Sequence, residues 1–398
     1  MVVDFSEKSD LYIINTCAVT AESGRKSAQI IRRALNRGGC VAVIGCYSQL
    51  DPTINEIQGV SYIGGNRDKA AVFRKADELL ENSRTRYEES FDLSGPGYES
   101  LCIGTQRTDV FSTCRAYVKI EDGCNGRCSY CIIPKVRGPV RSRPVAEIIS
   151  EVQRLAIKGY KEIILTGIET SAYDYAPLSE LINIVDGIEG IERLRFGSLS
   201  PNTITDGFLT AAADSRKFMP HIHLSLQSAS DRILKLMRRP YNKEQMIKKM
   251  EMINTRMPDM LISADFIVGF PTETESDFLQ TIDFVNAYGL SHVHAFPFSP
   301  RPGTAAASMS GKIPARELKK RNEILIEHSR NVKKRILERY NGESVKVLIE
   351  SIAKGEYRGH TEDFLETKFT SFTQKKIGDI AEVNISSTDG EYLIGRSE

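Results

Sequence analysis

A regular alternation of strand-like and helix-like segments, from Arg115 to about residue 300, constrains the fold of this chain more than any other feature. Apolar runs of strand length recur six times, at Tyr117–Ile120, Glu162–Thr166, Leu194–Gly197, His221–Leu226, Leu261–Val268 and Val293–Phe298. Segments with helical spacing separate them, including Val145–Ala156, Leu178–Val185, Glu244–Asn254 and Asp277–Tyr288. Repeated right-handed strand–helix units close into a barrel whose chemistry lies at the carboxyl ends of the strands. Six units are fewer than the usual eight, so we predict a partial (β/α)6 barrel, open to a large substrate.

The loop after the first of these strands carries three cysteines in the spacing C-x₃-C-x₂-C. It reads Cys124-Asn-Gly-Arg-Cys128-Ser-Tyr-Cys131, and Gly123 and Gly126 allow its backbone to turn tightly. Thiolates at such short spacing bind iron–sulfur clusters or zinc. A structural zinc site would want a fourth ligand nearby, and no Cys or His follows within the next turn or two. A four-iron cluster on three cysteines instead leaves one iron open to a substrate, and the cysteine count favours this reading.

The first 81 residues alternate in the same way. Strands are predicted at Leu11–Asn15, Val41–Ile44 and Val60–Ile63, with helices at Glu22–Asn36 and Lys69–Leu80. Strand–helix–strand units of this length indicate an open parallel α/β sheet of the flavodoxin-like kind.

Two cysteines follow strands of this sheet directly. Cys17 and Cys46 each fall just beyond the carboxyl end of a strand, and in a parallel sheet those ends share the edge where ligands bind. They suggest a second metal site, although buried small thiols would fit the same positions. Cys40 starts the strand that Cys46 follows, so we interpret it as a core thiol at the opposite end.

The C-terminal part of the chain changes character twice. A helix dense in Lys and Arg is predicted over Ala315–Tyr340, as a solvated brace or as a contact to RNA. The hydrophobic period then switches to two in five short segments, Val345–Ile349, Tyr357–Thr361, Lys368–Ser371, Ile380–Ile385 and Tyr392–Gly395. This pattern predicts a small antiparallel β-barrel. Basic residues interleaved with Tyr357, Phe364, Phe369 and Phe372 suit RNA binding, but an ordinary barrel with a phenylalanine core fits equally well.

Length and composition are those of a multidomain globular protein. We predict four segments in the 398 residues: an α/β domain (1–81), a polar connector (82–113), a barrel with the basic helix (114–340) and a β-barrel (341–398). Cys102 in the connector and Cys114 at its end are interpreted as incidental thiols. No apolar run approaches ~18 residues, and the N-terminus lacks a secretory signal. Clustered cysteines favour metal binding in a reducing compartment over a disulfide frame, and we expect a cytoplasmic monomer. The net charge of +1 neither requires nor excludes a nucleic-acid partner.

These motifs resemble the radical S-adenosylmethionine (SAM) superfamily and, within it, the methylthiotransferase family. The three-domain order matches an N-terminal cluster domain, a radical SAM partial barrel and a TRAM-type RNA-binding barrel. Several runs look most like the branch that acts on threonylcarbamoyladenosine in tRNA: Asn15-Thr-Cys-Ala-Val-Thr20, Gly45-Cys-Tyr-Ser-Gln49, Arg115-Ala-Tyr-Val-Lys-Ile120, Val136-Arg-Gly-Pro-Val-Arg-Ser-Arg-Pro144 and Met237-Arg-Arg-Pro-Tyr241.

The resemblance implies the cofactors and the reaction. A 4Fe-4S cluster on Cys124, Cys128 and Cys131 would donate an electron to SAM, giving a deoxyadenosyl radical that removes hydrogen from carbon 2 of the adenine. An auxiliary cluster on Cys17 and Cys46 would supply the sulfur, and a second SAM would methylate it. The expected SAM contacts are Tyr130, Glu169, Ser198, Gln227, Arg239 and Asp265, with Arg239 pairing with the SAM carboxylate.

The same resemblance implies the partners and the alternatives. The substrate would be a tRNA anticodon stem-loop, and the electron donor a protein such as flavodoxin or ferredoxin. Alternatives are a methylthiotransferase for isopentenyladenosine tRNA or a ribosomal protein, and an RNA-binding paralogue that keeps only the SAM cluster.

The sequence departs from the family pattern at three places. The family holds its auxiliary cluster with three cysteines, and Cys17 and Cys46 match the second and third of them. The first normally lies in a βα unit that would precede Met1, so we expect the sheet to lack its first strand and the cluster to lack one ligand, either because the start of this sequence is truncated or misassigned or because the ligand has been lost. Ala229 and Thr272 stand where glycine is common in the family.

Overall fold

The structure is a computed structural model that describes residues 3–5, 7–51, 53–54, 57–66, 69, 71–81, 87–88 and 114–398. Two compact units divide the chain. The first unit comprises residues 1–111, 122–141 and 299–308, and the second comprises 112–121, 142–298 and 309–398. The three-cysteine loop therefore groups with the N-terminal sheet, although the strand that precedes it belongs to the barrel. Most of the predicted connector, with Cys102, lies outside the described residues, and the four-segment division stays a prediction.

The first unit is built on a parallel sheet with the strand order β1-β2-β3-β4. Its elements are β1 (Leu11–Thr16), α1 (Ala21–Leu35), β2 (Cys40–Gly45), α2 (Cys46–Leu50), β3 (Val60–Ile63), α3 (Ala71–Arg74), α4 (Ala76–Glu81) and β4 (Tyr87–Glu88). Helix α1 begins at a capping box formed by Thr20 and Ser23. The predicted strands and first helix are confirmed, whereas the helix expected over Lys69–Leu80 is two short helices that break at Lys75.

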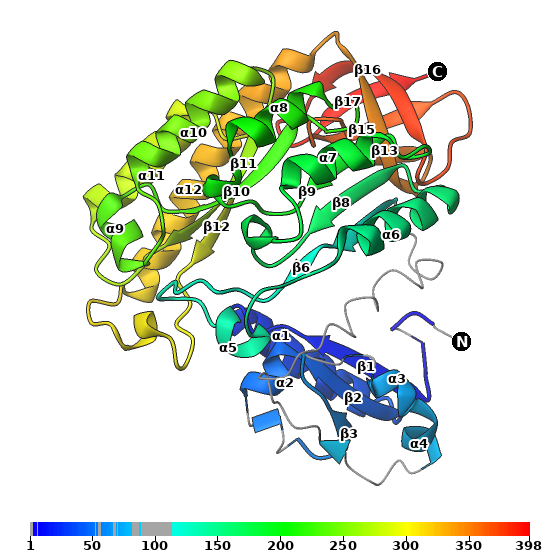
Figure 1. Cartoon of the computed structure of the whole chain (residues 1–398), viewed down its shortest axis with the longest axis vertical. Coiled ribbons are helices and arrows are strands. Elements are labelled where there is room, and N and C mark those ends of the chain that lie inside the picture. Colours follow the sequence, from blue (N-terminus) through cyan, green and yellow to red (C-terminus); the bar gives the residue numbers. More distant parts are fainter. Residues whose placement is uncertain are drawn as a thin grey trace. The chain divides into compact units, whose positions relative to one another are not determined.

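Strand β2 is buried along its whole length because helices cover both faces of the sheet. Its alternate residues Val41 and Val43 pack with α1 on one face. Ala42 and Ile44 pack with α3 and α4 on the other face (Figure 1). This near-continuous apolar strand is typical of a parallel sheet buried on two sides.

The second unit contains the predicted six-stranded partial barrel. Its strands are β5 (Arg115–Lys119), β8 (Glu162–Thr166), β9 (Arg193–Phe196), β10 (His221–Gln227), β11 (Leu261–Val268) and β12 (His292–Pro297). They form two parallel sheets, β5-β8-β9 and β10-β11-β12, and the isolated bridges Leu194–Phe218 and Leu199–Leu224 connect β9 to the segment around β10. Strands β5 and β12 end the two sheets, and among the described residues they do not pair with each other, so the six strands form an arc rather than a closed barrel.

Helices lie outside these strands (Figure 1). They are α6 (Val145–Ile157), α7 (Leu178–Asp186), α8 (Asp206–Asp214), α9 (Asp231–Leu236), α10 (Lys243–Arg256) and α11 (Glu275–Ala287), with short 3₁₀ turns at Thr170–Ala172 and Pro201–Thr203. The chain crosses between the two units near the short strands β6 (Glu121–Asp122) and β7 (Arg141–Ser142) and again near the 3₁₀ turn Ala305–Ser308.

The basic helix and the C-terminal barrel complete the second unit. Helix α12 (Ala315–Leu337) buries its apolar face and continues into a 3₁₀ turn, Glu338–Tyr340. The barrel consists of β13 (Ser344–Ala353), β14 (Glu356–His360), β15 (Glu366–Ser371), β16 (Ile380–Thr388) and β17 (Leu393–Ser397), and it closes in the order β13-β14-β15-β17-β16. The prediction of an antiparallel barrel needs one correction, since β15 and β17 pair in parallel. Residues 372–392 contain the intervening strand β16, which makes this parallel return possible.

A buried ion cluster connects the partial barrel to the C-terminal barrel. Glu162 of β8 is fully buried and lies 2.8 Å from Arg115 Nε and 3.3 Å from Arg195 Nε. Arg193 Nη1 is 3.7 Å from the same carboxylate, and Arg115 also pairs with Glu350 of β13. The guanidinium groups of Arg193 and Arg195 donate to backbone carbonyls of the C-terminal barrel, those of Lys346, His360, Thr361 and Glu362. Accordingly, one continuous hydrophobic core extends through both barrels.

No helix among the described residues is both long enough and apolar enough to cross a membrane.

Candidate functional site

The three-cysteine loop of the first unit begins with a turn that only glycine can make. Gly123 has φ +88°, and a Cβ added there would lie 2.0 Å from the carbonyl oxygen of Pro139. The amide of Cys124 donates to Gly138 O at 3.1 Å, which closes the turn. The backbone before the first cysteine is therefore determined by close packing against the segment that follows the third.

The sulfur atoms of this loop fit an iron–sulfur cluster. The amide of Gly126 donates to Cys124 Sγ at 3.2 Å. A Cβ at Gly126 would lie 3.0 Å from that sulfur and 4.0 Å from Cys128 Sγ, so both sulfurs lie on the side chain-free face of this residue. The amide of Cys131 donates to Cys128 O at 3.1 Å, and all three cysteines are partly buried. Amide hydrogen bonds to sulfur are one of the means by which proteins tune such clusters, and the donor set agrees with a cluster on three cysteines.

Helix α5 (Ile133–Arg137) continues from this loop and packs against the N-terminal sheet of the same unit. Ile132 and Val136 form a small buried cluster with Ala18 and Cys46. The first unit therefore brings the segment after the three cysteines into contact with one of the two cysteines predicted to hold an auxiliary cluster.

Arg137, at the end of α5, contacts the sulfur of Cys46. Its Nε donates to Cys46 Sγ at 3.4 Å, and its Nη1 donates to both carboxylate oxygens of Asp122 at 3.0 Å. Burial opposes the charge of this guanidinium, but Asp122 and Cys46 more than offset burial and raise the pKa of Arg137. A cationic donor beside a sulfur is a setting in which cysteine reacts or binds metal.

Cys17 and Cys46 each follow a strand at the same edge of the sheet, as predicted. Strands β1 and β2 pair in parallel with Thr16 opposite Gly45, so the next residue of each is a cysteine. Cys17 is exposed and Cys46 is buried. Cys40 starts β2, where its Sγ lies 3.0 Å from a backbone carbonyl of α4, which confirms that it is a core thiol at the other end of the strand.

Cys114 differs from these residues in its environment. It precedes β5 in the second unit and is buried. Burial raises the pKa of its thiol to about 11, so the group stays protonated at neutral pH. This agrees with the prediction of an incidental thiol.

The predicted SAM contacts of the second unit come from four strands and the segments that follow them: Glu169 after β8, Ser198 after β9, Gln227 at the end of β10, Arg239 after α9 and Asp265 in β11. Tyr130 belongs to the three-cysteine loop of the first unit. These assignments stay predictions.

Arg239 is held in place by its neighbours. Its Nε donates to the Tyr241 hydroxyl at 2.8 Å, and its Nη2 donates to Ser225 O at 3.1 Å. Its guanidinium also lies 4.8 Å from the centre of the Tyr241 ring. A carboxylate ligand would therefore meet a guanidinium that is already oriented.

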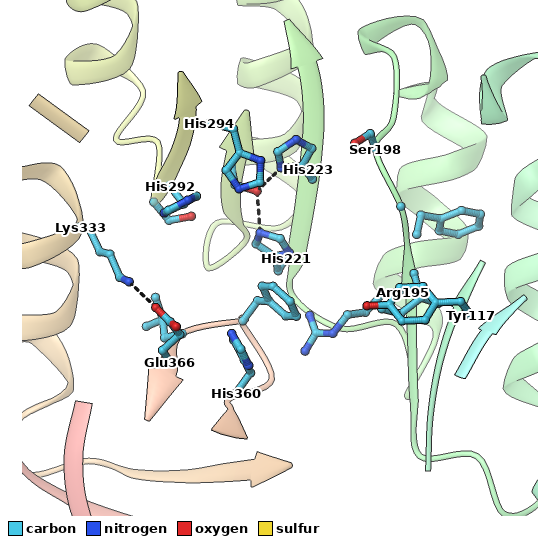
Figure 2. A pocket seen from close by; sticks show the side chains of 17 residues that line it. Tyr117, Arg195, Ser198, His221, His223, His292, His294, Lys333, His360 and Glu366 are labelled. Atoms are coloured by element: carbon cyan, nitrogen blue, oxygen red, sulfur yellow. Dashed lines mark hydrogen bonds and ion pairs between the residues drawn. The ribbon is translucent and has the colours of Figure 1, made fainter. Parts of the chain in front are cut away.

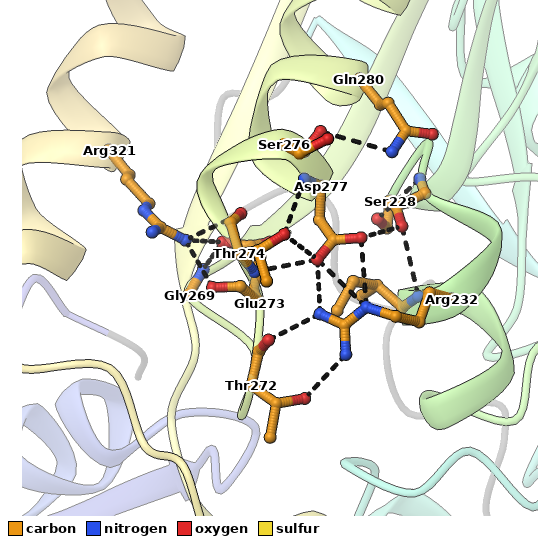
Figure 3. A network of polar contacts seen from close by, with 12 residues as sticks. Ser228, Arg232, Gly269, Thr272, Glu273, Thr274, Ser276, Asp277, Gln280 and Arg321 are labelled. Atoms are coloured by element: carbon orange, nitrogen blue, oxygen red, sulfur yellow. Dashed lines mark hydrogen bonds and ion pairs between the residues drawn. The ribbon is translucent and has the colours of Figure 1, made fainter.

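A network of polar contacts connects the loops after β10 and β11 (Figure 3). Ser230 donates to Asp277 Oδ1 at 2.6 Å, and Thr274 donates to Asp277 Oδ2 through its amide at 2.9 Å. Arg232 pairs with the same carboxylate and donates to Thr272 O at 2.6 Å. Burial raises the pKa of Asp277, but hydrogen bonds from Arg232 and Ser230 outweigh burial and hold this pKa well below the usual value of 3.8. The carboxylate therefore holds both loops while it is ionised.

Glu273 supports the loop after β11 from the other side. It accepts from the Gly269 amide at 2.8 Å and from Arg321 of α12 at 2.9 Å (Figure 3). The two loops contain strained residues, because Gln227 and Thr272 both have φ +67°. Glycine adopts a left-handed backbone without strain, which agrees with the glycine that the resemblance implies at the position of Thr272.

A cavity of about 430 Å³ lies inside the second unit, and five of the six histidines of the chain line it. The five are His221, His223, His292, His294 and His360 (Figure 2). Other polar lining residues are Tyr117, Arg195, Ser198, Ser263, Ser291, Lys333 and Glu366. The cavity is bounded by the inner face of the partial barrel and by the β14–β15 segment of the C-terminal barrel.

The sequence interpretation missed these histidines. His221 and His223 stand two apart in β10, and His292 and His294 stand two apart in β12. Alternate residues of a strand share a face, so two His-x-His pairs in neighbouring barrel strands were a readable signal for a polar interior. Burial lowers the pKa of His292 to about 4 and that of His221 well below 6.5, so both are neutral at pH 7.

Asp265 of β11 contacts two of these imidazoles. Its Oδ1 lies 2.9 Å from His223 Nε2 and 3.3 Å from His294 Nδ1. Burial raises the pKa of Asp265, but the hydrogen bonds from His223 and His294 outweigh burial and lower it to about 2. Asp265 is therefore ionised at neutral pH and shared by two histidines.

The aromatic residues predicted to bind RNA divide into core and surface. Tyr357 and Phe369 are buried and stack on each other at 5.3 Å. Phe364 stacks on His221 and His360 inside the second unit. Phe372 is 78% exposed, with the Arg396 guanidinium 5.4 Å from its ring centre. Only Phe372 of these four presents an open ring.

Comparisons with known families match two parts of the chain. Residues 118–285 match the radical SAM superfamily, and residues 1–63 match a family described as uncharacterized protein family UPF0004. The chain is 35% identical to threonylcarbamoyladenosine tRNA methylthiotransferase MtaB of Bacillus subtilis (strain 168), over 99% of this chain and 89% of that protein. It is 35% identical to the protein of the same name from Aquifex aeolicus (strain VF5), over 96% and 93%. A tRNA-2-methylthio-N(6)-dimethylallyladenosine synthase of Thermotoga petrophila is 33% identical over 98% and 89%.

Solved structures show the same fold at lower identity. The radical SAM methyltransferase TsrM from Kitasatospora setae, with cobalamin and a 4Fe-4S cluster bound, aligns with a TM-score of 0.58 and 16% identity, over 76% of this chain and 64% of that one. The cobalamin-dependent SAM radical enzyme OxsB aligns with a TM-score of 0.51 and 12% identity, over 82% and 50%. Given relatives 35% identical along nearly its whole length and the three-cysteine loop, the chain belongs to the radical SAM methylthiotransferase family.

Proposed function

We propose that this chain is a tRNA methylthiotransferase that places a methylthio group on carbon 2 of threonylcarbamoyladenosine beside the anticodon. The observation that carries the proposal is the arrangement of cysteines in the first unit, where α5 after the three-cysteine loop packs against Cys46. A reaction that needs one cluster for SAM and another for sulfur requires two such groups of cysteines. Relatives named for this activity cover nearly the whole chain.

The cofactors are a 4Fe-4S cluster and SAM, which supply the one-electron chemistry that opens an unreactive C–H bond. In the proposed site Cys124, Cys128 and Cys131 hold the cluster, and the Gly126 amide stabilises the charge on sulfur. Cys17 and Cys46 hold the auxiliary cluster, with one ligand fewer than the three that the resemblance implies.

The second unit would orient SAM. Arg239, held by Tyr241, pairs with the SAM carboxylate. Glu169, Ser198 and Gln227 of this unit, with Tyr130 of the three-cysteine loop, provide contacts to the adenine, ribose and methionine parts, while the network around Asp277 keeps the loops after β10 and β11 in position. Asp265, predicted with them, instead pairs with His223 and His294.

The tRNA is bound by its anticodon stem-loop, with contacts from the C-terminal barrel. Phe372 and Arg396 support this assignment because an exposed ring beside a guanidinium offers base stacking and phosphate attraction together. We further propose that the chain acts as a cytoplasmic monomer and takes electrons from a protein such as flavodoxin or ferredoxin.

Mass spectrometry of tRNA nucleosides tests the activity. Cells that lack only this gene should lose 2-methylthio-threonylcarbamoyladenosine, and the intact gene should restore it. Cys128→Ala should not restore it, whereas the matched thiol deletion Cys114→Ala should, because Cys114 lies outside the site. An unchanged nucleoside in the deletion strain would refute the proposal, and loss of the dimethylallyl nucleoside instead would assign the chain to the branch of the Thermotoga relative.

Iron analysis tests the auxiliary site separately. Anaerobically reconstituted protein with two clusters should contain about eight irons per chain, and protein with the SAM cluster alone about four. The double variant Cys17→Ala/Cys46→Ala should lower the count to about four. A wild-type count of about four would reject the role of these two cysteines and favour an RNA-binding paralogue.

A further inference from the structure

Three side chains from neighbouring strands of the second unit converge on one point in the barrel interior. They are His223 of β10, Asp265 of β11 and His294 of β12. The strand register explains the convergence. Asp265 of β11 lies opposite His294 of β12. Ser263, two residues before Asp265 in β11, lies opposite His223 of β10. Their ligand atoms all lie within 4.8 Å of one another.

We propose that His223, Asp265 and His294 form a binding site for a divalent first-row metal ion such as Zn²⁺ or Fe²⁺. Two imidazoles and one carboxylate are a common donor set for both ions. Bonds of about 2.0–2.1 Å in tetrahedral geometry place ligand atoms about 3.3–3.4 Å apart. The distances from Asp265 Oδ1 to His223 Nε2 and to His294 Nδ1, 2.9 and 3.3 Å, are close to these values, so the ion needs only a slight opening of the triad.

A second layer of contacts orients His223 for this role. Its Nδ1 lies 2.7 Å from Ser263 Oγ, which leaves Nε2 facing Asp265. Ser263 Oγ in turn lies 2.9 Å from His221 Nε2. With the ion bound, His223 Nδ1–H would donate to Ser263, whose hydroxyl would donate to His221. Metal-binding histidines usually have such a partner at the second ring nitrogen, because it sets the tautomer and the ring orientation.

The surroundings leave positions open on the ion. His223 and His294 line the cavity of about 430 Å³, so water or a small ligand could complete the coordination. His292 lies next to His294, with ring centres 4.7 Å apart. The described residues that line this cavity include no cysteine, so the coordination should contain nitrogen and oxygen only.

Zinc binding to the full-length, anaerobically reconstituted protein tests the site, with Zn²⁺ alone as the probe. The X-ray absorption spectrum of bound zinc should show nitrogen and oxygen at about 2.0–2.1 Å, including imidazole, and no sulfur at about 2.3 Å. Asp265→Asn and His294→Ala should each abolish this one-equivalent binding. Ser263→Ala should weaken it about 10–100-fold, as expected for a positioning residue.

The matched control is His328→Ala, which removes the histidine of α12 that lies outside the cavity and should leave zinc affinity unchanged. Zinc bound through sulfur in the wild type, or full retention of binding in both Asp265→Asn and His294→Ala, would overturn the proposal. Asp265→Asn is isosteric, and the His294 side chain is 47% exposed, so neither substitution should unfold the protein.

Discussion

The buried carboxylate of Glu162 offers the sharpest test of how the two barrels of the second unit are joined. Glu162→Gln keeps the shape of the side chain but removes its charge. Three guanidinium groups, those of Arg115, Arg193 and Arg195, surround a carboxylate that has no exposed surface. With Glu350 the cluster carries three positive and two negative charges, and the substitution leaves three and one.

The expected loss is about 3–5 kcal/mol of unfolding free energy, the usual cost of breaking a buried ion pair while its partners stay buried. We expect the upper part of this range because one carboxylate serves three cations. Burial already lowers the pKa of Arg195 to about 10 despite the attraction of Glu162, which shows how strongly the site opposes an uncompensated charge. A loss of this size is a large share of the ~5–15 kcal/mol that typically stabilises a domain.

Hydrogen exchange measured by mass spectrometry is a suitable assay, because it reports on β8 and the C-terminal barrel separately from the first unit. Exchange through global unfolding of the second unit should accelerate by at least a hundredfold, while the first unit should be unaffected. The control is Glu192→Gln, which removes the same charge from an exposed pair with Lys161 at 3.3 Å and should cost less than about 1 kcal/mol. Equal protection in Glu162→Gln and Glu192→Gln would refute the reasoning.

Further predictions concern the loops after β10 and β11 and the RNA surface. Thr272→Gly should stabilise the protein by about 0.5–1 kcal/mol. The left-handed backbone conformation of Thr272 costs about 1–2 kcal/mol, and glycine removes this strain at a smaller cost in conformational entropy. Ala229→Gly should instead destabilise the protein, because Ala229 is buried and does not have a positive φ. Melting temperatures that shift in the same direction in Thr272→Gly and Ala229→Gly would contradict this reasoning. Asp277→Asn should lower the free energy of unfolding by about 1.5–3 kcal/mol at pH 7 and change it little in acid. The reason is that folding lowers the pKa of Asp277 below 3.8, so the ionised carboxylate stabilises the fold at neutral pH and this contribution is lost as the pH falls through the folded pKa. Urea unfolding of both proteins from pH 7 to pH 2 measures this effect, and a stability difference between wild type and Asp277→Asn that does not change with pH would contradict it. Phe372→Ala should weaken tRNA binding about tenfold in a filter assay at fixed salt without changing stability, and an unchanged Kd would exclude stacking on this ring.

Local pattern was sufficient for most of the secondary structure. Strands such as Glu162–Thr166 and Leu261–Val268 were predicted to the residue, because parallel strands are continuous apolar runs between turn residues. The helix expected over Lys69–Leu80 was wrong as one element, since a helical period does not report the turn at Lys75 between α3 and α4. The parallel pairing of β15 with β17 also depends on chain path, which periodicity does not encode.

The sequence by itself indicated the chemistry of the cysteine loop, because three thiols within eight residues, with Gly123 and Gly126 to turn the backbone, can converge on one cluster. It also placed Cys17 and Cys46 on one edge, since the carboxyl ends of parallel strands lie at the same edge of a sheet. Only the tertiary structure decided that α5 meets Cys46, that Tyr357 and Phe369 are core rather than RNA-binding surface, and that His223, Asp265 and His294 converge. These contacts join residues far apart in the chain, and their distances are fixed by strand register and side-chain packing rather than by spacing along the sequence.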